Sequence, residues 1–150
     1  MTFADLRAKY PNREAAFPSN LPKPTATELN RLIEKYHCQF PQSFIEFQLE
    51  QCIEIPMGDN AFDGFGFANT ELPLNMSLEE VLKDYESLEY PDHLIPFKQD
   101  NGDFWCFDTT SLAPEFSVVI FDHNSMAIEK DANYRWKNFI DWLDKTMLEE

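Results

Sequence analysis

Acidic residues around a tight turn are the first candidates for chemistry in this sequence. Asp100-Asn101-Gly102-Asp103 lies between two apolar runs, and a further acid, Asp108, follows the second run. Such a stretch suits a metal-binding loop, a pair of catalytic carboxylates or a simple hairpin turn. These three readings require different surroundings, which the rest of the sequence tests.

The metal-binding reading fits the sequence poorly. A calcium loop requires oxygen ligands at alternating positions and a carboxylate near its twelfth residue. The stretch after Asp103 is aromatic instead, FWCF. DNAFDG at 59–64 comes closer, but Ala61 stands at a ligand position and Thr70 stands where the glutamate is required. We therefore expect acidic turns without a metal ion, and nothing in the sequence asks for a cofactor.

The catalytic reading fits no better. Asp100 and Asp103 flank a turn, where carboxylates are usually solvated rather than held in a cleft with shifted pKa values. The three histidines are dispersed: His37, His93 and His123. Asp122 and His123 are adjacent in an expected strand, so their side chains point to opposite faces. We expect a chain that is not an enzyme; a hydrolase working through Asp122-His123 or a carboxylate pair is the alternative to test.

The charge balance favours a particular class of partner. The 150 residues carry 12 basic and 27 acidic side chains, a net charge of −15. Nucleic acid and anionic membranes are disfavoured because their phosphates repel such a chain. A basic protein partner is favoured, since opposite fields speed encounter. The alternative is that the charge serves solubility alone.

Length and composition indicate a globular domain in the cytoplasm. Hydrophobic residues make up 43% of the chain and include 14 phenylalanines. No apolar run is long enough for a membrane helix, and the N-terminus has no apolar signal-peptide core. The cysteines, Cys38, Cys52 and Cys106, lack the spacing of a disulfide framework or a zinc site, so we expect free buried thiols.

The first half of the chain is predicted to be mainly helical. Prolines between residues 11 and 24 favour an irregular N-terminal arm, 1–24, with a short helix over 3–10, followed by one domain at 25–150. A capping box, Thr25 with Glu28, predicts a helix whose apolar face includes Leu29 and Leu32. A second short helix is expected over 43–51, a strand over 53–57, a loop over 58–69, and a third helix over 77–87 that begins with a capping box from Ser77.

The second half is predicted to be mainly strands. Asn101-Gly102 is the strongest short signal for a hairpin, because its turn requires positive φ angles. On the second hairpin strand, Trp105 and Phe107 share one face while Phe104 and Cys106 share the other. A continuous apolar run predicts that 116–122 is a central strand. A returning strand is expected over 126–129, and a closing helix over 133–148. The fold class is therefore α+β, with a mainly antiparallel, twisted sheet packed with helices.

The pattern resembles the SUKH superfamily, most closely its Smi/Knr-type branch, over 21–148. The segments that carry the resemblance are Ile95-Pro96-Phe97, Asn101-Gly102-Asp103, Cys106-Phe107-Asp108, Phe121-Asp122-His123 and Phe139-Ile140-Asp141-Trp142-Leu143. The resemblance implies a non-enzymatic binding domain. Bacterial members resemble immunity proteins that neutralise a cognate toxin, often a nuclease, and fungal members are scaffolds in cell-wall regulation.

A cognate toxin of the nuclease type would give the acidic surface a use. Nucleases carry basic surfaces for phosphate, so an acidic binder competes with their substrate. The expected contact residues are Asp100, Asp103, Asp108, Asp122, Glu86, Glu89 and Asp92. A regulatory scaffold that docks several partners is the alternative function.

Overall fold

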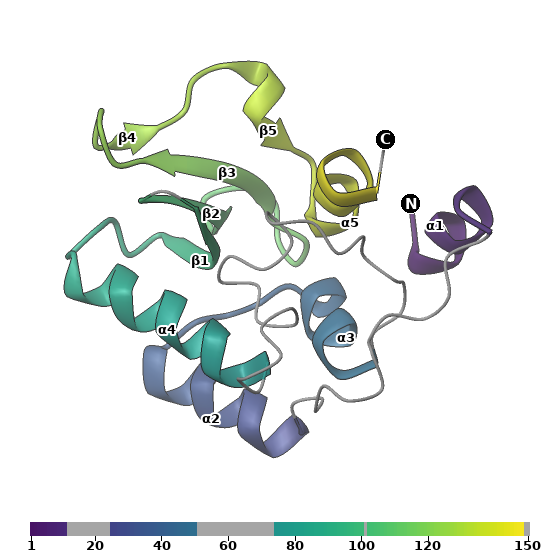
Figure 1. Ribbon diagram of the computed structural model, residues 1–150, viewed down its shortest axis with the longest axis horizontal. Helices are drawn as coiled ribbons and strands as arrows, with labels where there is room; N and C mark the ends of the chain where they lie inside the picture. The colour runs from purple at the N-terminus through teal and green to yellow at the C-terminus, as the bar shows by residue number, and fades with distance from the viewer. Residues whose placement is uncertain (12–24, 51–73, 101, 149–150) are drawn as a thin grey trace.

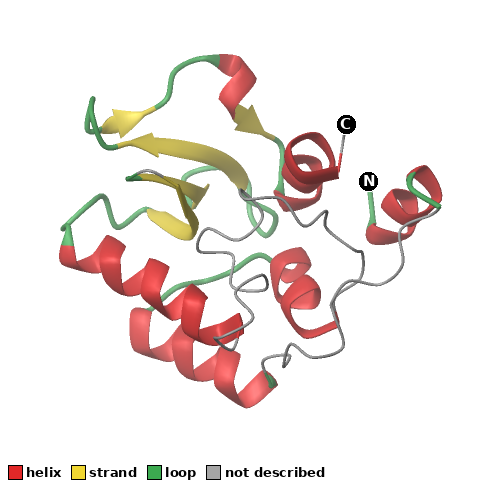
Figure 2. Cartoon of the chain, in the orientation of Figure 1, coloured by secondary structure: helices red, strands yellow, loops and turns green. Residues whose placement is uncertain are grey.

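Helices in the first half of the chain lead into an antiparallel sheet in the second half (Figures 1 and 2). The structure is a computed structural model, and it describes residues 1–11, 25–50, 74–100 and 102–148. Before the sheet lie α1 (Phe3–Lys9), α2 (Ala26–Tyr36), α3 (Gln42–Glu50) and α4 (Leu74–Ser87). The strand expected over 53–57 and the loop over 58–69 lie outside the described residues. None of the helices in the described ranges has the length and apolarity to span a membrane.

Local capping signals define where the early helices begin. Thr25 and Glu28 form the predicted capping box of α2, in which each side chain bonds the other residue's backbone amide. The same arrangement, from Thr2 and Asp5, starts α1. The predicted start of the third helix at Ser77 is wrong, because α4 already begins at Leu74. A Ser-x-x-Glu pattern also fits a helix interior, where serine carries only a small propensity penalty.

An antiparallel sheet forms the second half of the fold. Strands β1 (Leu94–Asp100) and β2 (Asp103–Asp108) make the predicted hairpin, with Asp100 opposite Asp103 and Leu94 opposite Asp108. Gly102 in the turn has a φ of +89°, which glycine adopts without strain. Strand β3 (Ser117–Asp122) pairs with β2 on one side and with β4 (Ala127–Ile128) and β5 (Arg135–Trp136) on the other. The predicted α+β class and the central place of 116–122 are confirmed.

The closing helix begins later than the sequence predicts. Residues Ala132–Tyr134 form a turn of 3-10 helix and Arg135–Trp136 form β5, so the predicted helical start at 133 is wrong. Helix α5 (Phe139–Trp142) continues as a π-helical turn over Leu143–Leu148. Asn138 caps α5 by accepting a hydrogen bond from the Asp141 amide at 2.9 Å. The apolar spacing that predicted this helix included Trp136, which is buried although it lies in β5. An inward-facing strand residue is apolar for the same reason as a buried helical residue, so the spacing does not separate the two.

The two faces of the sheet pack against separate hydrophobic clusters. Phe97, Phe107, Val118 and Ile120 face the larger cluster with α1, α2, α3 and α5, whereas Phe104, Cys106, Val119 and Phe121 face the smaller one. This division confirms the predicted faces of β2. Helix α4 contributes to both clusters, with Leu78 and Leu82 in the larger and Val81 and Tyr85 in the smaller. It therefore packs along β1, as Figure 1 shows.

Phenylalanine rings make up the centre of the larger cluster. Phe44 of α3 lies 5.7 Å from Phe97, 5.4 Å from Phe107 and 5.2 Å from Phe139, measured between ring centroids. Phe97 and Phe107 stack across the hairpin at 4.5 Å. All four side chains are fully buried. Aromatic pairs of this kind add about 0.5–1.5 kcal/mol each beyond the area that they bury.

The two ends of the described chain are joined by a buried carboxylate. Asp144, with 2% of its surface exposed, accepts hydrogen bonds from Lys9 Nζ at 2.9 Å and from the Tyr10 hydroxyl at 2.6 Å. Burial raises the pKa of Asp144, but the bonds from Tyr10 and Lys9 outweigh it and hold the pKa below its usual value. Phe3 and Leu6 of α1 lie in the larger cluster. A division of the chain at residue 24 stays a prediction.

Replacing Asp144 by asparagine is expected to destabilise the protein at neutral pH. The free energy of unfolding should fall by about 1–3 kcal/mol, because a charge-assisted bond to Lys9 is lost. Since the folded pKa is lowered, this contribution is complete above about pH 4 and disappears as the pH falls through the folded pKa. Urea titrations at pH 7 and pH 2.5 measure both effects, with Asp84→Asn on the exposed side of α4 as the control. A difference that is absent at pH 7, or unchanged at pH 2.5, contradicts the prediction.

Candidate functional site: an acidic corner beside a pocket

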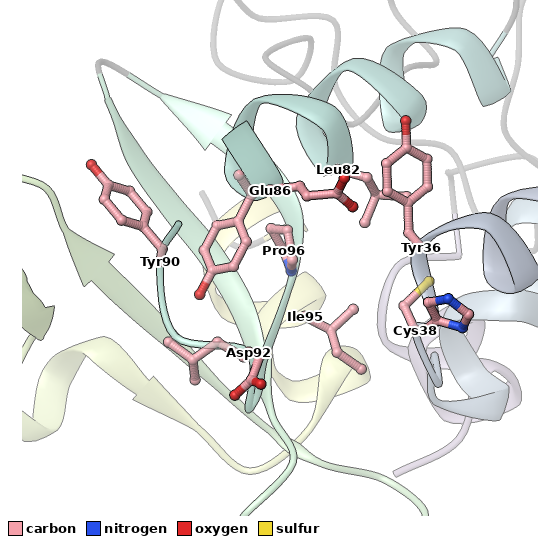
Figure 3. Close-up of a pocket in the computed structure, with 11 residues that line it drawn as sticks. Tyr36, Cys38, Leu82, Glu86, Tyr90, Asp92, Ile95 and Pro96 are labelled. Atoms are coloured by element: carbon pink, nitrogen blue, oxygen red, sulfur yellow. The ribbon is translucent and has the colours of Figure 1, made fainter. Parts of the chain in front are cut away.

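A pocket of about 200 Å³ opens where the end of α2, the last turns of α4 and the start of β1 meet (Figure 3). Ile95 and Pro96 of β1 line it together with Leu82 of α4 and Cys38, which follows α2. These four residues are buried and make one wall apolar. Around them the lining continues with Tyr36, His37, Tyr85, Glu86, Tyr90, Asp92 and Leu94. The pocket thus combines an apolar interior with aromatic and acidic groups.

Backbone turns at the ends of two helices shape this pocket. Helix α2 ends at His37, whose φ of 52° is left-handed, and the Cys38 amide bonds back to the Ile33 carbonyl at 3.2 Å. Helix α4 is followed by Glu89, also left-handed with a φ of 56°. The buried Tyr85 hydroxyl then donates to the Pro91 carbonyl at 2.5 Å. These bonds fix the loop that leads from α4 to β1.

Three of the predicted contact acids lie where α4 meets this loop: Glu86 is in the last turn of α4, and Glu89 and Asp92 follow on the loop. Glu86, Glu89 and Asp92, which we call the acidic corner, are all exposed, and Glu86 and Asp92 also line the pocket. In the described part of the chain, no cationic side chain forms an ion pair with any of them. Glu79, farther back on α4, differs because Lys35 and Arg31 bind it at 2.9 and 3.3 Å. The acidic corner therefore presents uncompensated negative charge.

Cys38 and His37 in the pocket do not provide a nucleophilic pair. Burial raises the pKa of the Cys38 thiol to about 12, so almost none of it is thiolate at neutral pH. A catalytic cysteine requires the opposite shift, which a neighbouring cation or a helix N-terminus provides. The expectation that this cysteine is a free, buried thiol is confirmed. The pocket is suited to binding rather than to covalent chemistry.

Asp103 and His123 join the hairpin tip to the turn after β3. The Asp103 carboxylate accepts a bond from the His123 amide at 3.1 Å and lies 2.7 Å from Nδ1 of its ring. A Cβ on Gly102 would approach that ring to 3.0 Å. Sequence reasoning expected Asp103 to be solvated and considered His123 only with its neighbour, so it missed this pair. The sequence shows that Gly102 and Asp103 lie at a turn. The contact of Asp103 with His123 depends on the register of the paired strands, which the sequence alone does not give.

Asp122 lies next to this pair and stabilises its own turn. Its carboxylate accepts a bond from the Asn124 amide at 2.8 Å, which is the main reason that its pKa is lowered. Ligand atoms of Asp103, Asp122 and His123 all lie within 4.8 Å of one another, a spacing that would allow a metal ion. The hydrogen bonds above already account for the positions of these side chains. The side chain of Asp100 lies outside the described residues.

Asp108 has a structural place at the other end of the hairpin. Only 4% of the residue is exposed, and its carboxylate accepts bonds from the Thr110 hydroxyl at 2.6 Å and from Arg135 at 3.3 Å. Burial raises the pKa of Asp108, but these bonds outweigh it and lower the pKa overall. The same carboxylate accepts a bond from the Thr110 amide at 3.0 Å and so caps the turn after β2. Its buried side chain has little surface to offer a partner.

The comparisons with known proteins assign the fold to a family. A family model described as SUKH_5, SMI1-KNR4 cell-wall, matches residues 3–148. The chain belongs to the SUKH family. A crystal structure of a protein from Pseudomonas syringae pv. tomato shares the fold, with a TM-score of 0.59, 20% identity, and coverage of 99% of this chain and 97% of that one. Comparison with the curated proteins gives no match.

The hairpin tip brings together two segments on which the resemblance to the SUKH family rests. Two segments that carried the resemblance, Asn101-Gly102-Asp103 and Phe121-Asp122-His123, meet through the contact of Asp103 with His123. Their shared role is to connect the ends of β1, β2 and β3. The predicted acids therefore divide between two ends of the hairpin: the acidic corner and Asp108 lie near the start of β1, and Asp103 and Asp122 lie near its end.

Gly102→Ala is expected to destabilise this SUKH domain by about 1–2 kcal/mol, because alanine is strained at positive φ and meets the His123 ring. The steric part should disappear when the ring is removed. We expect the cost of Gly102→Ala to be smaller in a His123→Ala background than in the wild type. A double-mutant cycle by urea denaturation measures the difference. Equal costs in both backgrounds would show that His123 does not restrict the turn.

Proposed function

We propose that the chain is an immunity protein that binds and neutralises a cognate, basic toxin of the nuclease type. The observation that supports this most directly is the acidic corner, where Glu86, Glu89 and Asp92 are exposed and carry no ion pair within the described residues. The SUKH family, to which the chain belongs, includes immunity proteins. In this proposal the protein acts in the cytoplasm and makes or breaks no covalent bond.

Electrostatics explains how such a binder would work. The net charge of −15 creates a long-range field that attracts a basic surface and raises the rate of encounter. A nuclease needs its basic surface to hold phosphate, so a protein that covers that surface excludes the substrate. Exposed charges interact over roughly 10 Å at 0.1 M salt, and higher salt screens them further. Binding through the acidic corner should therefore depend strongly on ionic strength.

A regulatory scaffold is the second candidate function. It is favoured by the description of the matching family model, which refers to the cell wall. A scaffold would bind several partners without protecting cells from a toxin. The two functions are distinguished by a protection assay, which has a defined result for each.

Coexpression is expected to protect cells from a basic toxin encoded beside this chain. The toxin's reading frame is expressed from an inducible promoter, with and without this chain, and surviving colonies are counted. Protection by wild type should be lost or reduced at least tenfold by Glu86→Gln/Glu89→Gln/Asp92→Asn. The matched control, Glu34→Gln/Glu129→Gln/Asp131→Asn, removes equal charge away from the acidic corner. No protection, together with capture of several unrelated proteins, would favour the scaffold.

The association rate of the complex is expected to fall steeply with salt. Between 50 and 500 mM NaCl we expect a decrease of about tenfold or more, because the steering field is screened. Stopped-flow or surface plasmon resonance with the purified toxin measures this rate. The variant lacking the three acids should have a smaller salt dependence than the control variant. A rate that is independent of salt would contradict an electrostatic mechanism.

A further inference from the structure

The pocket beside the acidic corner has features that fit one kind of side chain. We propose that it holds an arginine side chain of the basic partner, an inference that rests on the proposed function and identifies its anchor. The pocket has a volume of about 200 Å³ and is open to solvent at its acidic rim. Within the described residues, no lysine or arginine lines it. Its lining therefore combines room for a long side chain with two carboxylates, those of Glu86 and Asp92.

The apolar wall suits the methylene stem of such a side chain. Leu82 and Ile95 are 4% and 5% exposed, and Pro96 and Cys38 complete the surface. Long cationic side chains bury their stems along apolar surface and keep the charged group near polar atoms. The raised pKa of Cys38 keeps its thiol neutral, so this wall remains apolar at physiological pH. Since no lysine or arginine of the described residues lines the pocket, an acidic side chain of a partner would gain no ion pair from that lining.

The acidic rim suits a guanidinium better than an ammonium. In Figure 3 the carboxylates of Glu86 and Asp92 lie on either side of Ile95 and Pro96. A guanidinium has five donors in a planar fork and can serve two separated acceptors, whereas an ammonium is a compact point charge. Tyr36 adds an aromatic ring, over which a guanidinium stacks favourably. One cation of the chain already lies at this ring, since Lys35 Nζ is 5.3 Å from its centroid, so a guanidinium would have to contact the ring away from Lys35.

The neighbouring surface is less suited to a cation than the pocket is. A more open hollow of about 520 Å³ continues along α2 and α4 and shares Tyr36 and Glu86 with the pocket. It carries Lys35 and Lys83 in addition to its acids. These two lysines offset part of the charge of its three acids, Glu79, Glu80 and Glu86, so the hollow attracts a basic residue less strongly than the pocket does. The surface thus favours the pocket as the place for an arginine of the partner.

A small-molecule titration tests the pocket without the toxin. N-acetyl-arginine-N-methylamide is added to the ¹⁵N-labelled full chain at constant ionic strength, with the citrulline and lysine counterparts as comparisons. We expect saturable shifts of the Cys38, Leu82 and Ile95 amide signals with the arginine compound. Citrulline has the same shape without the charge, and its binding should be at least threefold weaker. Equal binding of citrulline or lysine, or shifts centred elsewhere, would overturn the proposal.

Two exposed substitutions test the residues of the rim. Glu86→Gln/Asp92→Asn should weaken binding of the arginine compound at least threefold, while Glu34→Gln, which removes one charge from exposed α2 surface, should leave it unchanged. All three positions are exposed, so the variants are expected to fold, and their amide spectra report this directly. Equal effects of the two variants would overturn the role of the rim.

The outcome for the pocket is separable from that for the proposed function. If cells are protected and toxin binding is salt-sensitive while the arginine compound fails to bind, the proposed function through the acidic surface is supported and the pocket inference is wrong. If the compound binds at the pocket while no toxin is neutralised, the anchor site stands for a different basic partner and the immunity function is wrong. Each result therefore decides one statement without the other.

Discussion

Aromatic packing around Phe44 is the constraint on which the rest of the structure depends. The rings of Phe97, Phe107 and Phe139 surround it, so one cluster joins α3, both strands of the hairpin and α5. Closely packed protein interiors tolerate changes in side-chain volume poorly. The rings of Phe97 and Phe107, which pack against Phe44, therefore determine the position of the hairpin. The loops at the two ends of the hairpin are positioned by it. Both candidate surfaces, the acidic corner and the hairpin tip, lie at these two ends.

This packing also explains why binding groups lie at the ends of the sheet. In the described part of the chain, both faces of β2 are covered, Phe107 by the larger cluster and Phe104 by the smaller. Phe104, Cys106 and Phe107 are fully buried and Trp105 is partly buried, so these faces offer little surface to a partner. Helix α4 connects packing with binding: Leu82 and Tyr85 are buried, and the next residue, Glu86, is exposed at the rim. Rigid packing on one side of the helix positions the carboxylate on the other.

Sequence patterns predicted the parts of the fold that local physics determines. The alternation of Trp105 and Phe107 against Phe104 and Cys106 gave the faces of β2, and Asn101-Gly102 gave the hairpin. The start of α5 was missed because apolar spacing does not distinguish a buried strand residue, Trp136, from a helical one. The pocket was out of reach, since its walls come from segments that meet only after folding. The same holds for Asp103 with His123, which depends on the register of three strands.

Some of the predicted contact acids form bonds within the fold, whereas those of the acidic corner form no ion pair in the described residues. This difference supports the proposed function. Asp103 and Asp108 bind side chains and backbone amides of neighbouring strands and turns, so their charges contribute to stability. The acidic corner places three exposed carboxylates at the end of α4 and on the loop that follows, in a chain with a net charge of −15, where mutual repulsion destabilises the folded state. Within the described residues no cation forms an ion pair with these three acids. A cation from a partner would relieve the repulsion, so part of the binding free energy would come from removing a repulsion that the free protein carries.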